Sequence, residues 1–300
     1  MAGLTYLVIA ATSRLLPPDE HYLGLTATQL EHFYGGRVVH FMVHDRVSFA
    51  GSILSVGLLY TWIGAVPLRA GEPWAFWTLV ISGAVGFASF LTYLGYGYYD
   101  AWHGAATLVL LPIFLLGLVR SYRGLSRPRG PSALIRQRIR SWRWSPASRG
   151  RMALGFSAFG MIAGGITIMI VGMTKVFVPQ DLEYMRVGRT DLVAISNKLV
   201  SLIAHDRAGF GGGLCSGGLI IAAVLVCGVR PRSPGLWWAL LLAGLTGFGC
   251  AIGIHPVVGY NSFIHLLPAY AGALAFLVGI ALLRKPMCRD TGPIDHFPDL

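Results

Sequence analysis

Charged residues are scarce in this chain of 300 residues, where Asp, Glu, Lys and Arg together make up only 12%. A soluble domain usually carries about 25% charged residues. Apolar residues, by contrast, reach 54% of the chain. A helix that crosses a bilayer core about 30 Å thick needs about 20 mostly apolar residues, and several runs of this length are present. The composition therefore argues against a soluble protein and indicates an integral membrane protein.

Sulfur ligands and nucleotide-binding motifs are equally sparse. The chain has four cysteines, none of them in a CxxC pair or another metal-binding spacing. We expect these cysteines to be small apolar core residues. No P-loop and no dinucleotide-binding fingerprint occurs, so the many glycines are better explained by close helix packing than by phosphate binding.

Long apolar segments, bounded by polar residues, divide the chain into helices. We predict an all-α polytopic membrane protein with eight transmembrane helices. The predicted spans are residues 2–16, 47–66, 74–96, 101–119, 153–177, 208–228, 236–258 and 263–283. The first of them is too short to cross a bilayer unaided.

One short string occurs twice. His44, Asp45 and Arg46 recur 161 positions later as His205, Asp206 and Arg207, and further matches pair residues 18–120 with 179–282. This predicts two four-helix repeats, which run parallel because four is an even number of crossings. The predicted parts are repeat 1 at 1–120 with a short first helix, a basic loop at 121–152, repeat 2 at 153–283 and a tail at 284–300.

The net charge of +11 is concentrated in one loop, where ten arginines and no acid lie between Arg120 and Arg151. Basic loops stay on the cytoplasmic side of a membrane. We therefore expect the loop at 120–152 and the C-terminus to be cytoplasmic, in the cell (inner) membrane. The loop could also contact an anionic lipid or a cytoplasmic protein, whereas nucleic-acid binding is not expected.

With this topology, eight of the nine histidines lie on the outer face. Four of them, His44, His103, His205 and His265, occupy matching positions in the two repeats. If His44 meets His103, and His205 meets His265, the four imidazoles could bind haem or a transition metal. The alternative is that each is an interfacial histidine bonded to a lipid headgroup or to a backbone carbonyl.

The neighbours of these histidines have two interpretations as well. Asp45 and Asp206 could cap helices while Arg46 and Arg207 extend to the interface. Alternatively, each carboxylate orients its neighbouring imidazole. Tyr98 and Tyr260, each a few residues before a predicted ligand, complete the set of supporting residues.

His40 and His44 are four residues apart and would share a helix face, which makes them a candidate metal-binding pair.

Three classes of function remain. The first is a membrane redox protein or enzyme, an oxidoreductase with haem or metal acting on a quinone or another lipid-soluble substrate. The second is a transporter for a small neutral solute, and the third is a non-catalytic subunit that docks a cytoplasmic partner. The sequence does not decide whether the chain is an enzyme.

Overall fold

The computed structural model describes residues 15–98, 101–126 and 146–288, together with Leu4, Leu7, Val8, Thr12 and Gly130. Within this part of the chain every regular element is helical and no strand occurs, as predicted. The α-helices are α2 (Pro17–Leu23), α3 (Ala27–Glu31), α4 (Arg37–Ile63), α5 (Pro73–Phe90), α6 (Thr92–Gly95), α7 (Ala101–Arg123), α9 (Pro146–Met173), α10 (Pro179–Met185), α11 (Arg189–Ile195), α12 (Leu199–Ala223), α13 (Pro234–Val258) and α14 (Phe263–Cys288). A 3₁₀ turn (Tyr34–Gly36) precedes α4, and π-helical segments follow α4 (Gly64–Leu68) and α12 (Val224–Gly228).

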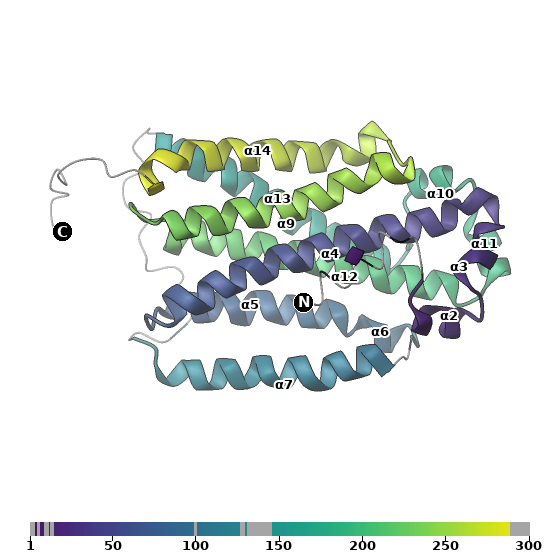
Figure 1. The fold of residues 1–300 in the computed structure, drawn as a ribbon, viewed down its shortest axis with the longest axis horizontal. Helices are drawn as coiled ribbons and strands as arrows, with labels where there is room; N and C mark the ends of the chain where they lie inside the picture. Colours follow the sequence, from purple (N-terminus) through teal and green to yellow (C-terminus); the bar gives the residue numbers. More distant parts are fainter. Residues whose placement is uncertain are drawn as a thin grey trace, which may run out of the picture.

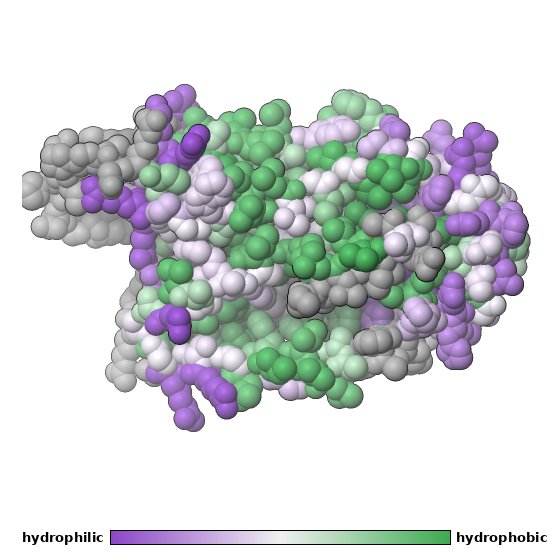
Figure 2. All heavy atoms as spheres, in the orientation of Figure 1, coloured by the Kyte–Doolittle hydropathy of each residue, from purple (hydrophilic) through white to green (hydrophobic). Residues whose placement is uncertain are grey.

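Seven segments of the described chain are long and apolar enough to cross a membrane. They are Tyr34–Leu68, Pro73–Gly95, His103–Arg123, Ala147–Met173, Leu199–Gly228, Pro234–Val258 and Phe263–Cys288. Figure 2 shows the result on the surface, where hydrophobic side chains form a broad central band and hydrophilic ones gather toward the two ends. The chain has the character of a multi-pass membrane protein. The remaining predicted span, residues 2–16, falls almost entirely outside the described residues.

Three helices begin earlier than the charge pattern suggested. α4 starts at Arg37 rather than 47, α12 at Leu199 rather than 208, and α9 at Pro146 rather than 153. Each of these predicted spans began only after the charged residues that precede it. In α4 and α12, however, these charges continue the helix because other buried groups pair with them, as shown below. The two His-Asp-Arg strings therefore lie about two turns inside their helices rather than at the helix ends.

Five of the long helices form a closed ring in which each packs against the next, in the order α4, α13, α14, α9 and α12. Outside the ring, α5 packs on α12 and α7 packs on α5. Four short helices, α2, α3, α10 and α11, gather at one end of the bundle, on the right of Figure 1. We call this the short-helix end. Both His-Asp-Arg strings lie in the part of α4 and α12 nearest to it.

Glycines allow the ring helices to approach closely. A Cβ atom on Gly165 of α9 would lie 2.6 Å from the backbone nitrogen of Cys215 in α12, and one on Gly211 of α12 would lie 2.7 Å from that of Met169. Small residues have this role in membrane helix pairs because little apolar driving force exists between helices in lipid. The glycines of α9 and α12 thus determine how closely these two walls of the ring approach each other.

Candidate functional site

The two His-Asp-Arg strings are buried rather than interfacial. Between 1% and 7% of the surface of each of their six residues is exposed. The residues at the helix N-caps are Gly36 for α4 and Lys198 for α12, so the interpretation of the aspartates as caps is wrong. The alternative in which both arginines extend to the interface is also wrong, because both guanidinium groups are enclosed.

The burial is explained by ion pairs that cross between the two strings. Arg46 donates from Nε to Asp206 Oδ2 at 2.9 Å, and Arg207 donates from Nε to Asp45 Oδ2 at 3.1 Å. Each arginine therefore pairs with the aspartate of the other string. A buried charge is costly unless it is paired and hydrogen-bonded. The reciprocal pairs meet this condition and connect α4 to α12.

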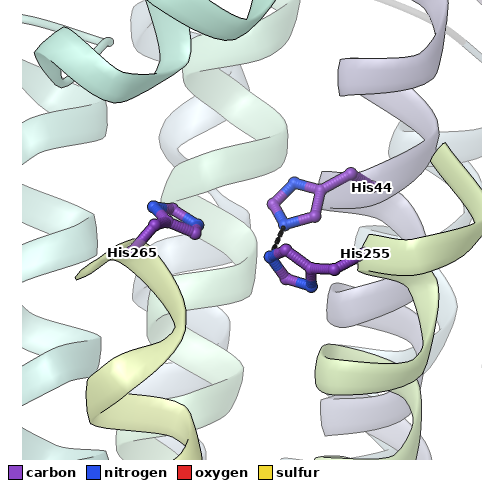
Figure 3. A group of neighbouring side chains, drawn as sticks. All are labelled: His44, His255 and His265. Carbon is purple, nitrogen blue, oxygen red and sulfur yellow. Dashed lines mark hydrogen bonds between the residues drawn. The ribbon is translucent and has the colours of Figure 1, made fainter. Parts of the chain in front are cut away.

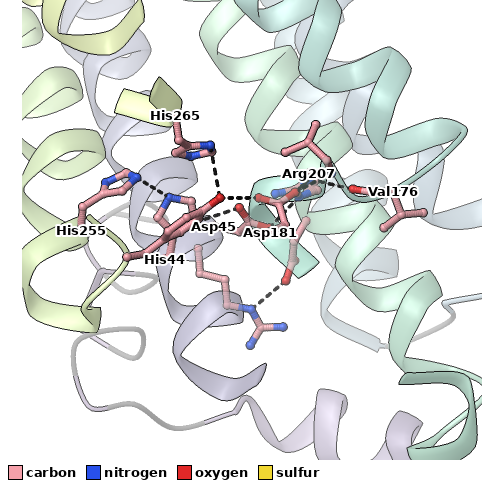
Figure 4. Close-up of polar contacts among 11 residues, drawn as sticks. His44, Asp45, Val176, Asp181, Arg207, His255 and His265 are labelled. Atoms are coloured by element: carbon pink, nitrogen blue, oxygen red, sulfur yellow. Dashed lines mark hydrogen bonds and ion pairs between the residues drawn. The ribbon is translucent and has the colours of Figure 1, made fainter. Parts of the chain in front are cut away.

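Each arginine also contacts a second carboxylate from a short helix. Arg46 lies 2.6 Å from Asp19 of α2, and Arg207 lies 2.7 Å from Asp181 of α10. Arg207 donates in addition to the backbone carbonyl of Val176 at 2.7 Å. Figure 4 shows this arrangement around Arg207. The short helices are thereby attached to the buried network.

Asp19 and Asp181 have the same three contacts. Each accepts a hydrogen bond from the backbone N–H three residues before it, at 2.9 Å and 2.8 Å respectively. Each also accepts one from a tyrosine hydroxyl, Tyr98 at 2.5 Å and Tyr260 at 2.8 Å. The sequence interpretation did not include these aspartates. The signal that could have revealed them is a doubled Pro-x-Asp sequence ahead of each repeated string.

Tyr260 lies in the turn between α13 and α14. Burial, reinforced by the neighbouring Asp181 carboxylate, raises the pKa of this phenol. Tyr260 therefore stays protonated at neutral pH and donates its hydroxyl proton to Asp181. Tyr260 also stacks on the ring of His265, with centroids 4.6 Å apart. This tyrosine thus connects the carboxylate network to the histidines.

Three histidines from three different helices converge beside Asp45. His44 of α4 and His255 of α13 approach to 3.0 Å between their Nε2 atoms, and His265 of α14 completes the group. One ligand atom from each lies within 4.8 Å of the other two, and Figure 3 shows the rings facing one another. On its other side, His44 places Nδ1 3.2 Å from Asp45 Oδ1. We call these three residues the histidine triad.

The second string has a matching but smaller arrangement. His205 of α12 and His103 of α7 approach to 3.0 Å between their Nε2 atoms. The rings of Phe90, Tyr93 and Tyr98 lie around His103, with centroid distances of 5.3, 5.2 and 5.0 Å. Aromatic residues thus surround two histidines in this centre, whereas the first centre has three histidines.

The structure brings the four predicted histidines together differently from the sequence interpretation. The predicted meeting of His44 with His103 and of His205 with His265 does not occur, because His44 faces His255 and His265 while His205 faces His103. There are two centres in place of one four-histidine site. His40 is exposed and does not belong to the triad, whereas His255, which was not among the predicted ligands, does.

The separation of the His44 and His255 nitrogens, 3.0 Å, fits two ligands of one metal ion better than the two imidazoles of a haem. Two nitrogens at right angles about one ion, each at the usual 2.0–2.1 Å, lie about 3.0 Å apart. Ligands on opposite faces of a haem iron lie about 4 Å apart, which is longer than the His44–His255 separation. The nearest charges also favour a cation, because Asp45 and Asp181 face one arginine, Arg207, and leave a formal charge of −1.

A cavity of about 610 Å³ lies inside the five-helix ring and has the triad in its wall. His44, His255 and His265 line it together with Asp45 and Arg207. Serines at 48, 52 and 55 continue along one face of α4, and most of the remaining lining residues are apolar or glycine. The cavity thus joins a polar site to an apolar space within the membrane-spanning part of the bundle.

No protein-family model, no curated protein and no solved structure matches this chain.

Proposed function

We propose that the chain is a membrane metalloenzyme of the redox class, in which His44, His255 and His265 hold a divalent transition metal ion. The observation that carries this proposal is the buried triad, with three ligand atoms within 4.8 Å of one another at the wall of a cavity. Imidazole nitrogens suit zinc, copper, iron and nickel. Three protein ligands leave a coordination position for a substrate or for water, which is the pattern of catalytic rather than structural sites.

Asp45 has the position expected of a residue that orients a ligand. Its Oδ1 atom lies 3.2 Å from His44 Nδ1, within ion-pair distance, while His44 Nε2 faces His255 and the cavity. A carboxylate in this place selects the tautomer and increases the basicity of the coordinating nitrogen. Arg207 in turn holds Asp45 through the other carboxylate oxygen, at 3.1 Å. The crossed ion pairs thus support the triad as well as the fold.

The test is metal analysis of purified protein. We expect the wild type to bind one transition metal ion and His255→Ala to lose it, because the triad is reduced to two ligands. His40→Ala is the matched control: it removes an exposed histidine of the same helix as His44 and should leave the metal content unchanged. A wild type that stays metal-free after incubation with zinc, copper and iron salts would contradict the proposal. A Soret band in the absorption spectrum would show that the bound cofactor is haem rather than a single metal ion.

The proposal includes the repeat organisation and the membrane orientation. Eight spans in two parallel repeats, at 1–120 and 153–283, explain why contacts of one string recur at the other, including the Arg46–Asp206 and Arg207–Asp45 pairs. The protein then lies in the inner membrane, with the basic loop and the tail on the cytoplasmic side. The loop remains a proposed contact for an anionic lipid or a cytoplasmic protein. Most of it, residues 127–129 and 131–145, lies outside the described residues.

A second candidate function, transport of a small neutral solute, is favoured by the row of serines. Ser52 and Ser55, with Thr167 of α9, line the cavity, whereas Thr92 does not. Hydroxyls along a membrane cavity could bind a polar solute as it crosses. Uptake by proteoliposomes that persists in His255→Ala would favour a transporter over a metalloenzyme.

A further inference from the structure

The cavity has two chemically different parts. Its polar part lies at the triad, near the short-helix end, where Asp45 and Arg207 also reach the wall. Its longer part is bounded by apolar side chains such as Met161, Leu214 and Phe248, with glycines between them. A ligand that fills it must therefore have a small polar head and a larger apolar body.

The volume of the cavity sets the size of that ligand. The volume of about 610 Å³ lies in the range of about 300–1,000 Å³ that is usual for small-molecule sites. This is the size of a long-chain alcohol or of a ring with a short tail. Such molecules partition into the bilayer, so they would reach the protein from the membrane rather than from water.

The cavity wall reaches the surface on one side. Among its described lining residues, those that are exposed lie on α9 and α14: Phe156, Gly160 and Thr167 on α9, and Pro268 and Ala271 on α14. The lining residues of α4, α12 and α13 are all buried or half-buried. The opening is therefore between α9 and α14, and in a membrane it would face lipid.

The packing of α9 and α14 accounts for the position of this opening. Nearer the end opposite the short helices, the two helices are in tight contact: a Cβ atom on Gly150 would lie 2.9 Å from Leu283 Cγ, and one on Gly279 would lie 2.6 Å from Leu154 Cγ. The exposed lining residues all follow this contact in the direction of the triad. The helices are thus packed together at one end and leave the cavity wall exposed between that contact and the histidines.

We propose that a lipid-soluble amphiphile, with a hydroxyl or carbonyl head and an apolar body, enters this cavity from the bilayer between α9 and α14 and places its head oxygen at the triad. The inference deepens the proposed function by naming the substrate class of that site. The head oxygen occupies the coordination position that three histidines leave open. The apolar body lies against the α9, α12 and α13 walls, where its burial stabilises binding.

Photolabelling tests the entrance. The protein in nanodiscs is incubated with a long-chain primary alcohol that carries a diazirine, and labelled peptides are identified by mass spectrometry. We expect labelling in α9, α12 and α13 that excess unlabelled alcohol suppresses and the alkane of equal length does not. Labelling that both competitors suppress equally, or that neither suppresses, would overturn the proposal.

Two glycines of α9 provide a matched pair of variants. A Cβ atom on Gly160 or on Gly155 would meet nothing within 4 Å, yet only Gly160 lines the cavity. We expect Gly160→Phe to lower the competed labelling about tenfold and Gly155→Phe to leave it unchanged. Gly164→Leu, inside the cavity with only ordinary contact to Leu214, should act like Gly160→Phe. Equal labelling of all three variants would overturn the proposed entrance between α9 and α14.

The same experiment separates this inference from the metal proposal. Metal content is measured on every sample, and labelling is repeated with His255→Ala. Competed labelling in a wild-type protein that binds no metal would support the amphiphile site and refute the metalloenzyme. A metal-bound wild type with no competed labelling would refute the amphiphile site and leave the metal centre standing.

Discussion

Single residues in this protein serve two purposes at once, and Asp45 is the best example. One oxygen of its carboxylate lies 3.2 Å from the His44 ring, and the other accepts a hydrogen bond from Arg207. Asp206, its counterpart in the second string, accepts a hydrogen bond from Arg46 in the same way. The difference between the two aspartates is therefore the histidine triad beside Asp45. Variants of these two aspartates can therefore separate a contribution to the stability of the fold from a contribution to the histidine site.

We predict that Asp45→Asn lowers metal affinity 10- to 100-fold, the usual effect of losing a carboxylate that orients a ligand. Asp206→Asn should leave metal affinity nearly unchanged. Both variants weaken one buried arginine–carboxylate pair, so their thermal stabilities should fall by similar amounts. Titration with a competing chelator, alongside thermal unfolding, measures both effects. An equal loss of affinity in the two variants would mean that Asp45 acts only through the fold.

At the scale of single residues, the sequence identified most of the participants. His44, His265 and both Asp-Arg pairs were recognised because they recur at a fixed offset. His255 was omitted because nothing in the other repeat corresponds to it as a histidine. Asp19 and Asp181 were omitted because each looks like an ordinary residue in the first turn of a short helix, and only packing brings them to the arginines.

Among the helices, α9 lines the cavity and packs on both α12 and α14. Its contact with α12 depends on Gly165 and Gly211, where the two backbones approach closely. Gly155 of the same helix faces open space. A methyl group added at Gly165 and one added at Gly155 should therefore have opposite effects on the stability of the protein.

Gly165→Ala should destabilise the protein by about 1–3 kcal/mol, because the added Cβ would lie 2.6 Å from backbone atoms of α12 and the helices must move apart. Gly155→Ala should be neutral or stabilise it by up to about 1 kcal/mol, since alanine favours the helix. Unfolding in detergent, followed by circular dichroism, measures the difference. Equal stability of the two variants would show that the α9–α12 contact is less tight than described.

The helices themselves were largely predictable, but their ends were not. Length and apolar character are local properties, so seven of the predicted spans each correspond to an observed helix. The ends of α4 and α12 were misplaced by ten and nine residues because their buried charges resemble a membrane boundary. A charge can be recognised as buried only when its partners are known, and one partner of each arginine lies about 160 positions away.

For the whole molecule, the notable feature is an inequality between two similar centres. His44 faces two histidines, whereas His205 faces one histidine and has Tyr93 beside it. Tyr93 contacts both His103 and His205, with centroid distances of 5.2 and 6.1 Å. In the proposed two-repeat organisation, the first centre is the proposed metal site and the second lacks a third imidazole.

We predict that Tyr93→His converts the second centre into a three-histidine site and raises the metal content from one ion to two. Tyr93→Phe keeps the ring but adds no ligand, so it should stay at one ion. Elemental analysis of both variants, combined with His255→Ala to empty the first centre, shows which site is filled. A Tyr93→His protein with unchanged metal content would contradict the equivalence of the two centres.

The sequence by itself determined the class of the protein, the positions of its apolar helices and the recurrence of the His-Asp-Arg string. These follow from composition, segment length and repetition, all of which can be read along the chain. Only the tertiary structure decided which histidines meet. His44 and His255 are 211 positions apart, and His103 and His205 are 102 apart. Their encounters depend on which helices become neighbours, and that choice is made by side-chain packing across the bundle rather than by any local pattern.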